Sequence, residues 1–231
     1  MKLLLIALSG LVLAGCLEIA ASADVQPNGA VQAEVEIAIS AQLVAIQGAL
    51  AKDRGQQGDM LQNCGTVDPK EEAPKYYRIV KASRGVRGDM MTCTGVLMID
   101  DPVTAAAAFD PKYSDKEDGM VLESFSVTRL SATAYRLAAV IAEKPSTKTS
   151  DPTGDAMLAA MTANRFVSVT IRSKRIENTT GEMSPDGTSV TWKLPLLMLV
   201  KPPSGYRQEI KADVTYEESV VDRAKRFLGL Q

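Results

Sequence analysis

The chain has 231 residues, with 26 basic and 28 acidic side chains, and it contains no histidine. Without histidine there is no Ser-His triad, no His-assisted cysteine nucleophile and little of the ligand set that zinc and iron sites use. A net charge of −2 gives no electrostatic basis for nonspecific binding to nucleic acid. We therefore expect a protein that is not an enzyme, needs no cofactor or metal, and does not bind nucleic acid.

The N-terminus is typical of an exported protein. A lysine precedes an apolar stretch, residues 3–12, that is too short to span a bilayer comfortably. It continues into Leu13-Ala14-Gly15-Cys16, which resembles the lipobox of bacterial lipoproteins. The resemblance implies that a signal peptide, residues 1–15, is cleaved and that acyl chains on Cys16 hold the protein on a membrane. The alternative is an ordinary secretory signal peptide cleaved near residues 20–23.

The mature chain, residues 16–231, begins with a predicted β-hairpin. In residues 31–39 apolar side chains alternate with polar ones, which is typical of a half-buried strand. The turn sequence Pro27-Asn28-Gly29 separates this run from residues 17–25. From Ser40 onward the apolar spacing becomes helical, which predicts a helix with Ser40 as its N-cap.

Cys64 and Cys93 remain as a pair if Cys16 carries lipid. Export places them in an oxidising compartment, which favours a Cys64–Cys93 disulfide. Closing a loop of about 30 residues would restrict the unfolded chain and stabilise the fold by about 3 to 4 kcal/mol. Two unpaired buried thiols are the alternative.

The rest of the chain alternates strand patterns with helix patterns, separated by polar turns. We expect strands at residues 76–80, 90–99, 121–128, 133–142, 165–171 and 206–216. We expect helices at residues 43–53, 101–109, 155–164 and 218–228. Irregular or turn structure is expected at residues 56–74, 83–89 and 185–187.

These elements predict an α+β fold, an antiparallel sheet with packed helices. We expect the hairpin at residues 17–39 and the strands within residues 165–216 to share one core, with Trp192 inside it. The Ser/Thr-rich segment at residues 145–154 is a possible weak domain boundary.

Both ends of the chain resemble a known family. The segment Gly181 to Leu196 reads GEMSPDGTSVTWKLPL, and together with the lipobox and the N-terminal Pro-Asn-Gly hairpin it is similar to bacterial LppM-type lipoproteins. The resemblance implies an α+β envelope domain, with lipid binding in at least one branch of the family. Many members carry a C-terminal membrane segment, whereas this chain ends at residues 227–231 without one.

Two groups of residues are candidates for contact with a lipid. The most apolar run outside the signal peptide would offer a surface to acyl chains or to a partner; it contains Leu194, Leu196, Leu197, Met198, Leu199 and Val200. A buried strand is the alternative for this run. Arg172 and Lys174 would lie on one face of a strand and receive anionic headgroups. The alternative for them is an exposed strand edge that cations keep soluble.

Acidic residues gather within residues 100–118 and raise the question of a calcium site. Their spacing matches no calcium-binding loop. A solvated acidic surface is therefore the preferred interpretation.

Together these features predict a membrane-anchored envelope lipoprotein that binds a lipid or another apolar envelope component. The alternative is a structural lipoprotein that holds a protein partner at the envelope. Leu17, rather than aspartate, follows Cys16, and by resemblance to lipoprotein sorting signals this favours the outer membrane if the host is Gram-negative.

Overall fold

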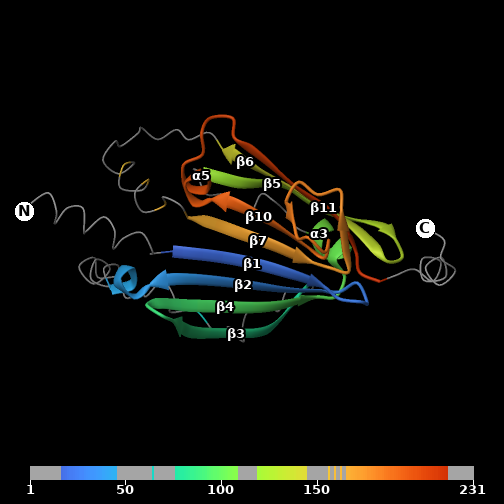
Figure 1. Cartoon of the computed structure of the whole chain (residues 1–231), viewed down its shortest axis with the longest axis horizontal. Helices are drawn as coiled ribbons and strands as arrows, with labels where there is room; N and C mark the ends of the chain where they lie inside the picture. The colour runs from blue at the N-terminus through green and yellow to red at the C-terminus, as the bar shows by residue number, and fades with distance from the viewer. Residues whose placement is uncertain are drawn as a thin grey trace, which may run out of the picture.

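The computed structural model describes residues 17–45, 64, 76–108, 119–144, 156, 159, 162 and 165–217. Strands account for 63% of these residues and helices for 13%, in two β-sheets (Figure 1). The expected α+β fold with packed helices is therefore wrong, and the fold is β-rich. The two complete helices in the described part of the chain, α3 (Pro102–Ala107) and α5 (Leu196–Val200), have six and five residues.

The first sheet has seven strands in the order β3-β4-β2-β1-β7-β10-β9. In that order the strands are β3 (Arg78–Arg87), β4 (Met90–Ile99), β2 (Val31–Ser40), β1 (Leu17–Val25), β7 (Phe166–Arg172), β10 (Ser189–Pro195) and β9 (Glu182–Met183). The second sheet has four strands: β5 (Gly119–Ser131), β6 (Ala134–Lys144), β11 (Arg207–Thr215) and β8 (Arg175–Glu177).

The sequence suggested an antiparallel sheet, but the first sheet is mixed. β1 pairs in parallel with β7, with Ile19 opposite Val167, whereas every other pair of neighbouring strands in the described residues is antiparallel. Parallel strands require a long crossover connection, and here more than half of the chain lies between the two strands. Local sequence patterns do not encode such a pairing.

The core lies between the two sheets, as expected for the N-terminal hairpin and the C-terminal strands. Inward residues of β1, β7 and β10, including Ile171, Val190 and the buried Trp192, pack with Tyr135, Val214 and other residues of the second sheet. In Figure 1 the second sheet lies beside β7 and β10, and β2, β4 and β3 continue away from it. The opposite face of the first sheet is therefore left without a second layer in the described part of the chain.

Several strands are longer than the sequence predicted, which is one reason for the higher strand content. β3 extends through the glycine-rich segment that was expected to be a turn, and the turn itself is only Gly88 and Asp89. Gly88 has a φ of +64°, which suits a tight turn. Gly85 instead lies within the strand, where a Cβ would be 3.0 Å from Thr92 Oγ1.

Both expected helix starts in the described part of the chain are confirmed. Ser40 Oγ accepts from the Leu43 amide at 3.2 Å, and residues 41–45 are helical. Asp101 accepts from the amides of Val103 and Thr104 ahead of α3. The Thr104 hydroxyl bonds the same carboxylate and, together with these amides, lowers the pKa of Asp101.

Several expectations lie outside the described residues. They are the signal peptide and Cys16, the irregular segment at 56–74 apart from Cys64, the boundary at 145–154 and the helix at 218–228. Of the helix expected at 155–164, residues 156, 159 and 162 are described and are helical. Within the described residues no helix is both long enough and apolar enough to cross a membrane.

Candidate functional site

A shallow groove runs along β1 on the outward face of the first sheet. Ala23 and Val25 of β1 pack on the core, so the alternation of the strand turns Glu18, Ala20 and Ser22 outward. The small Ala20 and Ser22 form the floor between larger side chains of the flanking strands. Two overlapping hollows of about 280 and 360 Å³ share Ala20, Glu36 and Ser168.

The two walls of the groove carry opposite charges. On the β2 side, Glu34 and Glu36 lie directly across from Ser22 and Ala20. On the β7 side the wall consists of hydroxyl and cationic side chains, namely Ser168, Thr170, Arg172 and, from β10, Lys193. A ligand that carries both an anionic and a cationic group would therefore find a complement on each wall.

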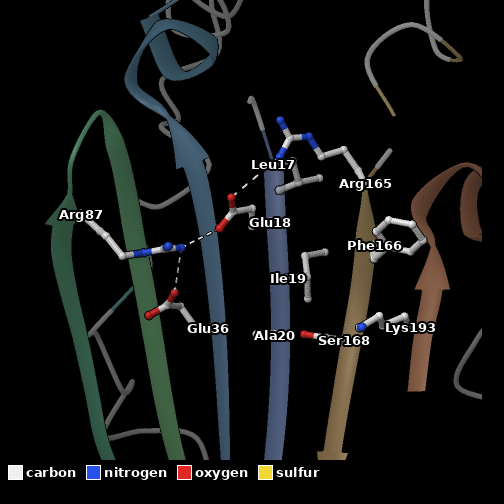
Figure 2. Close-up of a pocket in the computed structure, with 10 residues that line it drawn as sticks. All are labelled: Leu17, Glu18, Ile19, Ala20, Glu36, Arg87, Arg165, Phe166, Ser168 and Lys193. Atoms are coloured by element: carbon white, nitrogen blue, oxygen red, sulfur yellow. Dashed lines mark hydrogen bonds and ion pairs between the residues drawn. The ribbon is translucent and has the colours of Figure 1, made fainter. Parts of the chain in front are cut away.

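One end of the groove is closed by an ionic bridge (Figure 2). Arg87 Nη2 on β3 donates to Glu18 Oε2 at 2.7 Å and to Glu36 Oε1 at 3.3 Å. The hydrogen bond to Glu18 is the main reason why the pKa of Arg87 is raised. Both carboxylates at this end are thus paired with a cation.

Arg165 and Phe166 lie at the same end, where β7 begins. Arg165 Nη1 is 3.8 Å from Glu18 Oε1, and its buried Nε has no hydrogen-bond partner among the residues that the structure describes. Phe166 is 47% exposed beside it. An anionic group bound here would have a guanidinium and an aromatic ring within reach.

The predicted apolar run lies beside this end of the groove and is not one strand. Its first part completes β10 and the rest forms α5, which follows Pro195, a residue without an amide hydrogen. Leu194 and Leu196 are buried, and Leu197, Met198 and Leu199 are partly buried. The Leu196 amide donates to the Arg165 carbonyl oxygen at 2.8 Å, which ties α5 to the start of β7. The side chain of Val200 is not described.

Arg172 and Lys174 lie at the other end of β7. The prediction that they share one strand face is wrong, because β7 ends at Arg172 and Lys174 lies between β7 and β8. Arg172 is 3.5 Å from Asp24 at the far end of β1. The length of β7 separates Arg172 from Phe166 by about 20 Å, so the structure does not join the predicted cations with the predicted apolar run.

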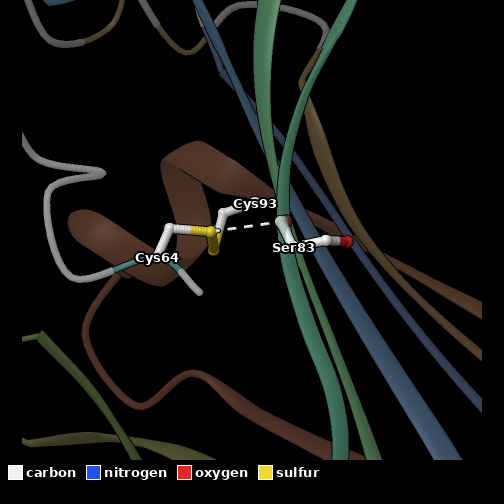
Figure 3. The surroundings of a disulfide bond; sticks show 3 residues. All are labelled: Cys64, Ser83 and Cys93. Atoms are coloured by element: carbon white, nitrogen blue, oxygen red, sulfur yellow. Dashed lines mark hydrogen bonds between the residues drawn. A yellow bond between two sulfur atoms is a disulfide. The ribbon is translucent and has the colours of Figure 1, made fainter. Parts of the chain in front are cut away.

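The predicted Cys64–Cys93 disulfide is confirmed (Figure 3). The Cα atoms are 5.7 Å apart, and Cys64 Sγ contacts the Ser83 carbonyl oxygen at 3.5 Å. Cys93 is level with Ile37 of β2 rather than with Glu36, so it lies on the sheet face opposite the groove. The disulfide fixes the sheet that carries the groove without lining it.

Sequence reasoning missed the residues that define the groove, above all Glu18, Arg87 and Lys193. One available signal was that β1 alternates apolar residues with small or polar ones, which suggests a shallow outward face. No sequence pattern links these three residues, because 69 positions separate Arg87 from Glu18. Within the described residues no cluster of acidic and cysteine side chains could hold a metal ion.

Comparison with known proteins gives one weak structural similarity. No protein-family model matches the chain, and no curated protein is significantly similar to it. The chain is similar to the folded domain of LppM from Mycobacterium tuberculosis, solved by NMR, with a TM-score of 0.44 and 16% sequence identity. The similarity covers 87% of this chain and 91% of that domain. It is a resemblance at the level of the fold.

Proposed function

We propose that this protein is a lipid-anchored lipoprotein of the bacterial envelope whose groove binds the polar head of an amphiphilic molecule. In this proposal it is not an enzyme and uses no cofactor. The observation that carries the proposal is positional: the groove begins at Leu17, the residue directly after the lipobox cysteine. An acyl-anchored protein would therefore present the groove close to its own membrane.

The composition of the groove supports an amphiphile as the ligand. Its walls offer carboxylates on one side and cations with hydroxyl groups on the other. Phe166 adds exposed apolar surface at the end near the anchor. The ligand class follows from this combination: a charged or zwitterionic head with an apolar part.

A second candidate is an interaction lipoprotein that holds a protein at the envelope. The observation that favours it is the pair of exposed valines on β3, an outer strand of the first sheet in the described chain. Val80 is 53% exposed and Val86 is 75% exposed. A partner strand could add to such an edge through main-chain hydrogen bonds.

Native mass spectrometry with lipid extraction tests the first candidate. The protein is purified from an exported, oxidised preparation and compared with Lys193→Ala, which removes a groove cation. Lys193 forms an exposed ion pair with Glu182. Arg175→Ala is the matched control, because Arg175 forms a similarly exposed ion pair with Glu177 outside the groove. We expect a lipid at defined stoichiometry in the wild type and the control, and less in Lys193→Ala.

A protein that stays free of lipid after incubation with envelope lipids would reject the binding proposal and favour the second candidate. Anchoring is tested separately with Cys16→Ser. We expect that variant to leave the membrane fraction, and the outer membrane is the expected location of the wild type in a Gram-negative host.

A further inference from the structure

We propose that the end of the first sheet at Leu17 lies directly against the membrane, with Arg165 and Phe166 at the level of the lipid headgroups. The strands then point away from the bilayer rather than lie along it. This inference rests on the proposed lipid anchor at Cys16 and adds an orientation to it.

The first argument for this orientation is the short connection between the anchored Cys16 and β1. β1 begins at Leu17, so no spacer separates the sheet from the anchored cysteine. Adjacent Cα atoms are about 3.8 Å apart, which leaves the folded domain almost no freedom to move away from the acyl chains. A domain on a long flexible linker would have no such constraint.

Strand register shows what else lies at this end. β1 and β2 pair so that Leu17 is level with Ile39, and β7 runs parallel to β1, so Phe166 is level with Glu18. β10 reaches the same level at Pro195, opposite Phe166, and α5 follows. In Figure 1 the start of β1, the tips of β2 and β10, and α5 all lie at one end of the molecule.

The chemistry of this end fits a headgroup layer. Within the described residues the buried Nε of Arg165 has no hydrogen-bond partner, and an arginine near a membrane surface is attracted to phosphate. The half-exposed Phe166 provides the apolar contact that interfacial segments use. Arg87 is bound to Glu18 and Glu36, so these carboxylates face the lipid phosphates already paired with a cation.

The opposite end of the sheet is distant from the anchor. β1 spans nine residues, so its two ends are about 26 Å apart. The turn at Gly29 lies there, packed against Tyr135 and Tyr216. In the proposed orientation this end projects away from the bilayer, and the bridged end of the groove lies at the level of the headgroups.

Headgroup quenching of tryptophan fluorescence tests the orientation. The lipidated protein is reconstituted in phosphatidylethanolamine and phosphatidylglycerol vesicles that contain a lipid with a nitroxide on its headgroup. Phe166→Trp places a reporter at the proposed contact. Leu130→Trp is the matched control. Leu130 is similarly exposed, and it lies next to Arg129, which is level with Tyr135 at the Gly29 end of the molecule, away from Leu17. The wild type, with its buried Trp192, provides the background.

We expect several-fold stronger quenching for Phe166→Trp than for Leu130→Trp. Insertion of flexible Gly-Ser residues between Cys16 and Leu17 should reduce this difference, because it releases the domain. Equal or reversed quenching in protein whose mass confirms the acyl chains would overturn the orientation but not the anchor. A mass without acyl chains would overturn both.

Discussion

Arg87 on β3 donates to Glu18 on β1 although two strands, β4 and β2, lie between them. With neighbouring strands about 4.8 Å apart, the two backbones are about 14 Å apart in a flat sheet. Both side chains must therefore lie extended across the sheet rather than point into solvent, as Figure 2 shows for Arg87. The residues between them are small: Ala38 is level with Glu18 and with Thr92, and Thr92 is level with Gly85.

The bridge leads to a first prediction, for Arg87→Ala. Arg87 and its partners are exposed, and exposed ion pairs contribute little to stability. We expect the melting temperature to change little, whereas lipid bound in native mass spectrometry should fall because Glu18 and Glu36 lose their shared cation. Arg175→Ala removes an exposed ion pair outside the groove, so it should leave both the melting temperature and the amount of bound lipid unchanged. A large loss of stability in Arg87→Ala would show that the bridge is structural.

A second prediction concerns Gly29→Ala. Gly29 has a φ of +84°, and a Cβ there would lie 2.6 Å from Tyr135 Oη. Tyr135 cannot move easily, because it stacks on Tyr216 at 4.9 Å and is buried, which raises its pKa to about 12. We expect a loss of about 2 to 4 kcal/mol in the free energy of unfolding, from backbone strain and steric overlap together.

Gly187→Ala is the control for that substitution. Gly187 has a φ of +69°, but a Cβ there would meet no atom of the described residues within 4 Å. It should therefore cost only the backbone strain, about 1 kcal/mol. Equal losses for the two variants in urea unfolding would refute the claim that Gly29 is required by close packing.

A third prediction concerns pH. Arg136 donates to both carboxylate oxygens of Asp213, at 2.7 and 2.8 Å, and Asn178 donates at 2.9 Å. The hydrogen bond from Arg136 is the main reason that the pKa of Asp213 is lowered. The folded-state pKa lies below the unfolded one, so this stabilisation is present above about pH 4 and is lost as the pH falls through the folded pKa.

Asp213→Asn removes this titration while it keeps the size of the side chain. Between about pH 7 and pH 3 the free energy of unfolding should fall more in the wild type than in Asp213→Asn. Other carboxylates, including Asp101 and Asp186, titrate in both proteins and cancel in the comparison. Identical pH dependence of the two proteins in urea unfolding would mean that Asp213 is not stabilised by its partners.

A fourth prediction concerns the disulfide. Cys64 and Cys93 are separated by 29 positions, so the double variant Cys64→Ala/Cys93→Ala should lose about 3 to 4 kcal/mol of stability. The pair lies on the sheet face opposite the groove, so the folded variant should still bind lipid at low temperature. Titration of free thiols in denatured, unreduced wild-type protein checks the pairing, and two reactive thiols besides any at Cys16 would contradict it.

Local features of the sequence predicted much of the fold. The alternation in residues 31–39, the Pro27-Asn28-Gly29 turn and the Ser40 cap are short-range patterns with a direct physical cause, and each matches the structure. Features that depend on distant contacts were not predictable. They include the parallel pairing of β1 with β7 and the groove, whose walls come from strands far apart in the chain.

The apolar run shows why composition alone was misleading. Its residues suggested one strand or one exposed patch, but Pro195 interrupts the strand and α5 buries part of the run. The run lies next to the site because the Leu196 amide at the start of α5 donates to the Arg165 carbonyl oxygen beside the start of the groove. Only the register of β7 and β10 places it there.

Occlusion of the groove tests the proposed function most directly. Ala20→Phe fills the floor of both hollows without removing any ionic contact, and Ala20 is exposed on a strand, where an aromatic side chain is tolerated. Ser126→Phe, at an exposed position of β5 outside the groove, is the control. In native mass spectrometry we expect the wild type and Ser126→Phe to retain lipid and Ala20→Phe to lose it. Undiminished lipid in a folded Ala20→Phe variant would contradict the proposal that the groove is the binding site.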